Sequence, residues 1–317
     1  MSKLFWSLVF GLLVNAAWTT TAQAIDSEVD ARFQALEKEL ADMKGSSQTT
    51  DGGSCKTWEA GAPCKTWETG AELTLLRPEI GSLVLRDVIQ DELQVTPDYN
   101  LNAALRVWLG REWSNGLGWR VTYWTFKDSA SLEFPEQFNN AAIRSDLNFY
   151  TVDLELTRQA KICSWDIYSS IGARIGGVDT TEMVNVSQST GSLSEHFTGG
   201  GLTFSMGTRQ ALGKSHWTLY GGFRGSLLYG MTNFNMNANV HDTITFNGEM
   251  EGSVADQTVF IVEMQLGLQY ERCTQFGVVF GRAGLETQLW ELPPIVAGIG
   301  DKNIGLLGPT FALGVRR

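Results

Sequence analysis

The residues of this sequence best suited to bind ions or form ion pairs are charged side chains that alternate with apolar ones. In residues 259–271, for example, Glu263 stands between Val262 and Met264. The charged residues that share such alternation are Glu72, Arg106, Arg120, Asp153, Glu155, Asp166, Arg174, Arg224, Glu263, Arg282 and Glu286. Because successive side chains of a β-strand point to opposite faces, we expect these charges on one face and the apolar residues on the other.

The charged face is expected to look into a closed, polar interior, because an Arg facing lipid at mid-membrane costs about 2–4 kcal/mol. Charges that pair across the strands would form a satisfied polar plug. Charges that segregate to opposite walls would instead leave a field across a water path, which selects small ions or polar solutes. The residues predicted to line the pore are Arg106, Arg120, Asp153, Glu155, Arg174, Arg224, Glu263, Arg282 and Glu286.

Three of these residues prompt a specific hypothesis. Arg224, Glu263 and Arg282 fall on three consecutive predicted strands, at similar distances from the short turns. A carboxylate between two guanidinium groups would be a strong, charge-assisted arrangement. We therefore predict a Glu-bridged Arg pair near the constriction.

Catalytic chemistry has little support in the sequence. There are three histidines, and no nucleophile motif of the GxSxG kind is present. His241 and Asp242 form the one candidate pair, in the longest predicted loop, and a dipeptide is a poor signal. Cysteine and histidine do not cluster at the spacing of a zinc site. The chain is therefore expected not to be an enzyme, and no cofactor or metal is expected.

The four cysteines suit an oxidising compartment. They are Cys55, Cys64, Cys163 and Cys273, and four cysteines allow three intramolecular pairings. Proximity favours Cys55 with Cys64, although either could also pair with another chain. Cys163 and Cys273 both lie beside predicted short turns, so we expect them on the same side of the membrane.

Segments that alternate at period two are the strands expected to position these side chains. They lie near residues 67–77, 99–113, 117–127, 146–159, 164–178, 196–210, 216–229, 257–271, 275–290 and 304–315. Short links alternate with longer polar segments near 78–98, 128–146, 179–195, 230–256 and 291–303. Short periplasmic turns and long external loops are typical of outer-membrane barrels. The expected fold class is therefore all-β, a transmembrane antiparallel up-and-down β-barrel of about ten strands.

The N-terminal residues indicate export. Residues 1–24 combine Lys3, an apolar run and a small-x-small cleavage pattern, as in a signal peptide. Residues 25–44 have heptad-like apolar spacing, which predicts a short helix that either stays single or joins protomers as a coiled coil. Residues 45–66 form a predicted linker with a CKTWE duplication, and residues 67–317 the barrel. The formal net charge of −11 argues against a nucleic-acid partner.

Three stretches carry a family resemblance: GAELTLLRPEIG at residues 70–81, ALRVWLGREWSNGLGWRVTYWTF at 104–126 and YSSIGARIGGV at 168–178. They are similar to pore-forming outer-membrane proteins of the Legionella major outer-membrane protein type. The similarity extends loosely from about residue 67 to the C-terminus. It implies a barrel with pore activity and a disulfide-linked or trimeric assembly, and it supplies no substrate.

Two functions follow as expectations for an outer-membrane protein surrounded by lipid. The first is a porin-like pore for passive passage of ions and small polar solutes. The second is a structural or adhesive barrel with a closed lumen, which acts through its external loops or through residues 25–44. An exported soluble β-protein is a third interpretation, and it would require the chain to stay in aqueous fractions without detergent.

Overall fold

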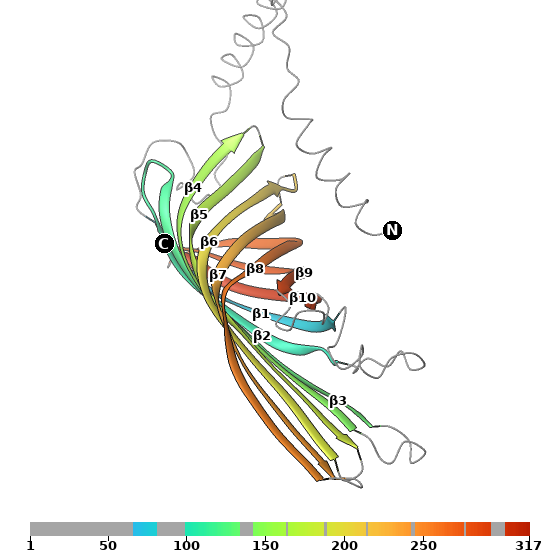
Figure 1. Cartoon of the computed structure of the whole chain (residues 1–317). Helices are drawn as coiled ribbons and strands as arrows, with labels where there is room; N and C mark the ends of the chain where they lie inside the picture. Colours follow the sequence, from blue (N-terminus) through green and yellow to red (C-terminus); the bar gives the residue numbers. More distant parts are fainter. Residues whose placement is uncertain are drawn as a thin grey trace, which may run out of the picture. The chain divides into compact units, whose positions relative to one another are not determined.

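The computed structural model describes residues 66–80, 99–133, 142–162, 164–186, 189–213, 215–241, 245–275, 277–292 and 302–317. Ten strands lie within these ranges: β1 (Thr66–Ile80), β2 (Asn102–Glu112), β3 (Leu117–Glu133), β4 (Ala142–Ile162), β5 (Trp165–Val186), β6 (Ser189–Ala211), β7 (Trp217–His241), β8 (Thr245–Thr274), β9 (Gly277–Leu292) and β10 (Lys302–Arg316). Each strand pairs antiparallel with its neighbours in sequence, and β1 pairs with β10. The sheet is therefore a closed barrel, as predicted (Figure 1).

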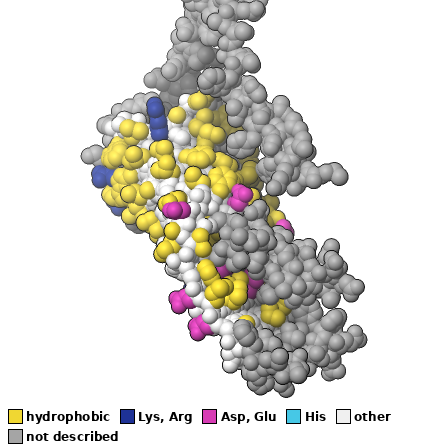
Figure 2. Space-filling view, viewed as in Figure 1, with side chains coloured by type: hydrophobic (Ala, Val, Ile, Leu, Met, Phe, Trp, Pro, Cys, Tyr) yellow, Lys and Arg dark blue, Asp and Glu magenta, His cyan; other side chains and the backbone are white. Residues whose placement is uncertain are grey.

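The alternation of side chains sorts them into two environments. Leu202 on β6 is 70% exposed on the outer surface, whereas Glu155 on β4 is fully buried inside the barrel. Most large exposed hydrophobic side chains belong to this outer face, and Figure 2 shows them gathered over one part of the barrel. A continuous apolar outer surface is the arrangement that lipid requires, and the charged side chains face the interior together with a buried apolar cluster. The predicted assignment of faces is confirmed.

Strand length divides the barrel into two parts. Strands β4 to β8 have 21 to 30 residues, whereas β1, β2, β9 and β10 have 11 to 16. Figure 1 shows the long strands running past the ends of the short ones. The paired row Lys127, Asn148, Asp179, His196, Asn233 and Ser253 marks where the strands become polar on their outer side. We call the part beyond this row, within residues 127–148, 179–196 and 233–253, the extension.

Three predicted loops are wrong for this reason. Residues 128–146, 179–195 and 230–256 were expected to be external loops, but most of each range lies in the β3–β4, β5–β6 and β7–β8 hairpins. Their backbone ladders continue beyond the apolar belt, where no lipid imposes an apolar outer face. The alternation of apolar and polar residues therefore ends before the strands do.

Short turns close the other end of the barrel, which we call the turn end. Gly116, at the β2–β3 turn, has a φ of 75°, a backbone conformation that residues other than glycine rarely adopt. The amide of Trp113 donates to the carbonyl of Leu117 at 2.7 Å and closes this hairpin. At the same end Trp67 and Arg317 exchange backbone hydrogen bonds, which extends the pairing of β1 with β10 to the last residue.

The predicted signal peptide, helix and linker over residues 1–65 lie outside the described residues, as does Asp242. Within the described part of the chain, no helix has the length and apolar character needed to cross a membrane.

The outer face makes a first prediction. Leu202→Arg is expected to lower the free energy of unfolding by about 2–4 kcal/mol, because the charge would face hydrocarbon. Asn239→Arg, an exposed position in the extension, is the matched control and should change it by about 0.5 kcal/mol or less. Urea unfolding in lipid vesicles measures both, and equal effects would mean that Leu202 does not contact lipid.

Candidate functional site: a layered lumen

Arg106 on β2 is the centre of the first cluster in the lumen. Its Nη2 lies 2.7 Å from Oε1 of Glu286 on β9 and 3.0 Å from Oε2 of Glu263 on β8. Its Nη1 also pairs with Glu72 on β1. One guanidinium therefore holds three carboxylates that come from three other strands.

Arg174 on β5 extends the cluster across the barrel. Its Nε and Nη2 lie 2.5 and 2.9 Å from the two carboxylate oxygens of Asp153, a bidentate pair. Its Nη1 lies 2.6 Å from Oε1 of Glu263, the carboxylate that also binds Arg106. Glu263 is thus the link between the two arginines.

Arg224 and Arg120 complete the network on the opposite side. Arg224 on β7 reaches across to β4, where its nitrogens lie 2.9 Å from Asp153 and 3.1 Å from Glu155. Arg120 on β3 donates from Nε and Nη2 to Glu155 at 3.1 and 2.9 Å. We call these four arginines, together with Glu72, Asp153, Glu155, Glu263 and Glu286, the ion-pair layer.

The ion-pair layer is nearly inaccessible to solvent at its centre. Asp153 and Glu155 are 0% exposed, and Arg174 is 1% exposed. Buried charges of this kind are stable only when they are paired, and removal of one partner is strongly destabilising. Eight of the nine residues predicted to line the pore meet in this layer, where their charges are neutralised by one another.

The prediction that Glu263 bridges Arg224 and Arg282 is wrong in its arginines. Arg224 lies directly opposite Glu263 in the β7–β8 register, but its side chain crosses the lumen to Asp153 and Glu155 instead. Arg282, the ninth predicted residue, donates to Gln269 and lies over the ring of Phe280, with 4.7 Å from its Cζ to the ring centroid. Glu263 does bridge two arginines, but they are Arg106 and Arg174.

An aromatic layer fills the lumen between the ion-pair layer and the extension. Trp290 on β9 packs against Phe149 on β4 with ring centroids 5.1 Å apart, and against Trp124 on β3 at 5.9 Å. Phe126 packs against Phe149 at 6.2 Å. In the ring of strands, β9 and β4 are five positions apart in either direction. Side chains from opposite walls therefore meet in the middle of the barrel.

The sequence interpretation did not include these rings. Their signal was available, because Trp124 and Phe126 share the alternation phase of Arg120, and Phe149 shares that of Asp153. Apolar residues in the inward phase are expected where a lumen is packed rather than hydrated.

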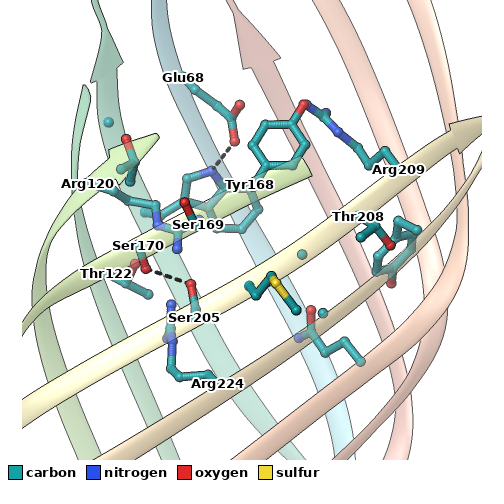
Figure 3. A pocket seen from close by; sticks show the side chains of 18 of the residues that line it. Glu68, Arg120, Thr122, Tyr168, Ser169, Ser170, Ser205, Thr208, Arg209 and Arg224 are labelled. Atoms are coloured by element: carbon teal, nitrogen blue, oxygen red, sulfur yellow. Dashed lines mark hydrogen bonds between the residues drawn. The ribbon is translucent and has the colours of Figure 1, made fainter. Parts of the chain in front are cut away.

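A cavity of about 240 Å³ lies on the turn side of the ion-pair layer. Figure 3 shows the side chains of Arg120, Arg209 and Arg224 approaching it from three strands, with the hydroxyl groups of Ser170 and Ser205 hydrogen-bonded to each other at 2.6 Å. Its mixed wall of cations, hydroxyl groups and aromatic rings can hold a polar solute.

The cysteine predictions are mostly outside the described residues. Cys273, at the turn end of β8, is disulfide-bonded. Cys55, Cys64 and Cys163 lie outside the described part of the chain, so the favoured pairing of Cys55 with Cys64 stays a prediction. Asp166, also predicted to face inward, lies opposite Arg209 in the β5–β6 register.

Several solved structures are similar to this chain at low sequence identity. The outer membrane protease OmpT from Escherichia coli has 11% identity and a TM-score of 0.42, covering 81% of this chain and 98% of that one. The outer membrane protein OprG from Pseudomonas aeruginosa has 9% identity and a TM-score of 0.32, with coverages of 81% and 98%. The toluene transporter TodX from P. putida has 7% identity and a TM-score of 0.35, with coverages of 81% and 90%. Similarity at these TM-scores is not evidence for any function of this chain.

Family membership rests on sequence. No curated protein matches the chain. The family model described as "Legionella pneumophila major outer membrane protein precursor" matches residues 61–314, which is most of the chain and nearly all of the barrel. The chain therefore belongs to this outer-membrane protein family.

Proposed function

We propose that this protein is an outer-membrane barrel whose lumen is closed at rest, and that it acts through its external extension as a structural or adhesive protein. The contact between Trp290 and Phe149 carries this proposal, because it joins opposite walls of the barrel. The buried ion-pair layer supports it, since a continuous water path would hydrate Asp153 and Arg174, which are almost fully buried.

The extension supports an external role. Beyond the closed part, β8 pairs with β7 from Thr245 onward but with β9 only from Phe260 onward. Its outer surface is mostly polar, and Figure 2 shows carboxylates on this part of the barrel. A wall that stands beyond the lipid on the side away from the short turns faces the exterior in an outer-membrane barrel.

Shortening the extension tests this role. Thr232 and Val254 are paired in the β7–β8 register, so residues 233–253 can be replaced by a two-residue Asn-Gly turn. The shortened barrel should keep its heat-modifiable gel mobility, and cells that display it should attach to surfaces less than cells that display the full chain. Attachment that depends on the protein but not on the extension would contradict the proposal.

A pore for ions and small polar solutes is the second candidate. The charged lumen and the cavity at the turn end favour it, and so does the family resemblance. Conduction would require the aromatic layer to open, which would also let water reach the buried ion-pair layer. Swelling of proteoliposomes in a small sugar separates the candidates: the closed barrel gives no more swelling than protein-free vesicles, and an open pore gives rapid swelling.

The proposal also gives roles to residues 1–44, which lie outside the described residues. Residues 1–24 would direct export, and residues 25–44 would join copies of the chain, for instance into a trimer. Crosslinking of the protein with and without residues 25–44 measures the second of these.

A further inference from the structure

We propose that the cavity at the turn end is a binding site for a small oxyanion of the carboxylate or phosphate class, with Arg209 as its principal ligand. The cavity is lined by the turn-end residues Thr66, Glu112 and Arg316, on the turn side of the ion-pair layer, so a solute arriving from that end would not have to cross the closed lumen. The inference is therefore independent of whether the barrel conducts.

Arg209 on β6 is positioned to bind an anion, because its only ion pair among the described residues is a long one. It is 6% exposed, and its guanidinium lies over the ring of Tyr168, with 3.9 Å from Cζ to the ring centroid. Its Nε and Nη1 donate no hydrogen bond to any residue that the structure describes. The carboxylate that it faces, that of Glu271, is 3.6 Å from Nη1 and is bound by Arg316 at 2.5 Å. Stacking on an aromatic ring leaves the planar edge of Arg available for bidentate binding of carboxylate or phosphate.

The charges of the cavity wall favour an anion. Among its lining residues, Arg106, Arg224, Glu72 and Glu263 neutralise one another or their neighbours in the ion-pair layer. The charged lining residues outside the ion-pair layer are Arg111, Arg209, Arg282, Arg316, Glu68 and Glu112. Arg120 belongs to the layer and is paired with Glu155, but its side chain is still 32% exposed. The remaining arginines exceed the remaining carboxylates, so the wall attracts negative charge.

Hydroxyl groups also line the cavity. Ser170 and Ser205 project from the neighbouring strands β5 and β6, and Thr122 lines the same cavity from β3. Ser170 donates its proton to Glu155 at 2.6 Å and accepts from Ser205 at 2.6 Å, so Thr122 is the hydroxyl group of these three that can donate to an anion oxygen. The volume of about 240 Å³ accommodates a small solute rather than a polymer.

Calorimetric titration tests the site. The full-length chain, refolded in a nonionic detergent at low ionic strength, is titrated with inorganic phosphate and, separately, with succinate. We expect at least one of the two to bind, and the tighter of the two identifies the class. Arg209→Gln should weaken that binding about tenfold or more, because a charge-assisted, bidentate contact is lost.

Two further variants keep the test decisive. Arg144→Gln removes an exposed arginine of the extension and should leave anion binding unchanged. Arg209→Lys keeps the charge but loses the planar fork, so it should bind more weakly than the wild type, and it replaces the Gln variant if that variant does not fold. The proposal is overturned if neither anion binds, if either Arg209 variant binds as tightly as the wild type, or if Arg144→Gln weakens binding equally.

Discussion

Arg106→Met is expected to lower the free energy of unfolding by about 3–5 kcal/mol, because it leaves buried carboxylates without their cation. Glu72, Glu263 and Glu286 all bind this guanidinium. Once it is removed, Glu263 keeps Arg174, but Glu72 and Glu286 repel one another in a site with little water. The loss should appear as a lower urea midpoint for the refolded protein in lipid vesicles.

The control for this prediction is an arginine that is paired but exposed. Arg144 pairs with Asp146 at 3.1 Å, and its side chain is 60% exposed. Arg144→Met should change the free energy of unfolding by about 0–1 kcal/mol, as surface ion pairs do. A second variant, Arg106→Met with Glu286→Gln, should be more stable than Arg106→Met alone. If the two single arginine variants lose equal stability, the ion-pair layer is hydrated and not buried.

Trp290→Ala is the second large effect expected. The indole is 1% exposed and contacts rings from β3 and β4, so its removal leaves a void in the middle of the lumen. Truncation of a large buried aromatic residue costs about 3–5 kcal/mol. The same void would make a water path through the aromatic layer, so the variant should also admit small solutes into proteoliposomes.

An outward-facing tryptophan provides the comparison. Trp217 lies on the outer surface at the turn end and packs against Tyr270, with ring centroids 5.2 Å apart. Trp217→Ala removes the same side chain without opening the lumen, so it should destabilise less and leave permeability unchanged. Equal permeability of the two variants would mean that Trp290 does not seal the barrel.

Period-two alternation alone predicts much of the barrel. Each of the ten expected segments overlaps one strand, and Glu263 and Leu266 lie on opposite faces as expected. This succeeds because the boundary between lipid and lumen acts on every side chain of a spanning strand. The same reasoning fails in the extension, where Asn235 and Asn237 lie in a strand with no lipid to select apolar neighbours.

The partners inside the lumen could not be predicted in the same way. Arg224 and Glu263 are opposite each other in the sheet, yet Arg224 binds β4 across the barrel. Which side chains meet across a lumen depends on the circumference and tilt of the closed sheet, and one strand's sequence does not contain that information. Trp290 and Phe149 meet for the same reason, from opposite walls.

Planar-bilayer recording of the refolded wild-type chain examines the closed lumen itself. Preparations that show the heat-dependent gel shift of a folded barrel should give no unitary current steps, whereas the double variant Phe149→Ala and Trp290→Ala should give them. Ohmic unitary steps from the wild-type chain, at a frequency that follows the folded fraction, would contradict the closed lumen and favour the pore.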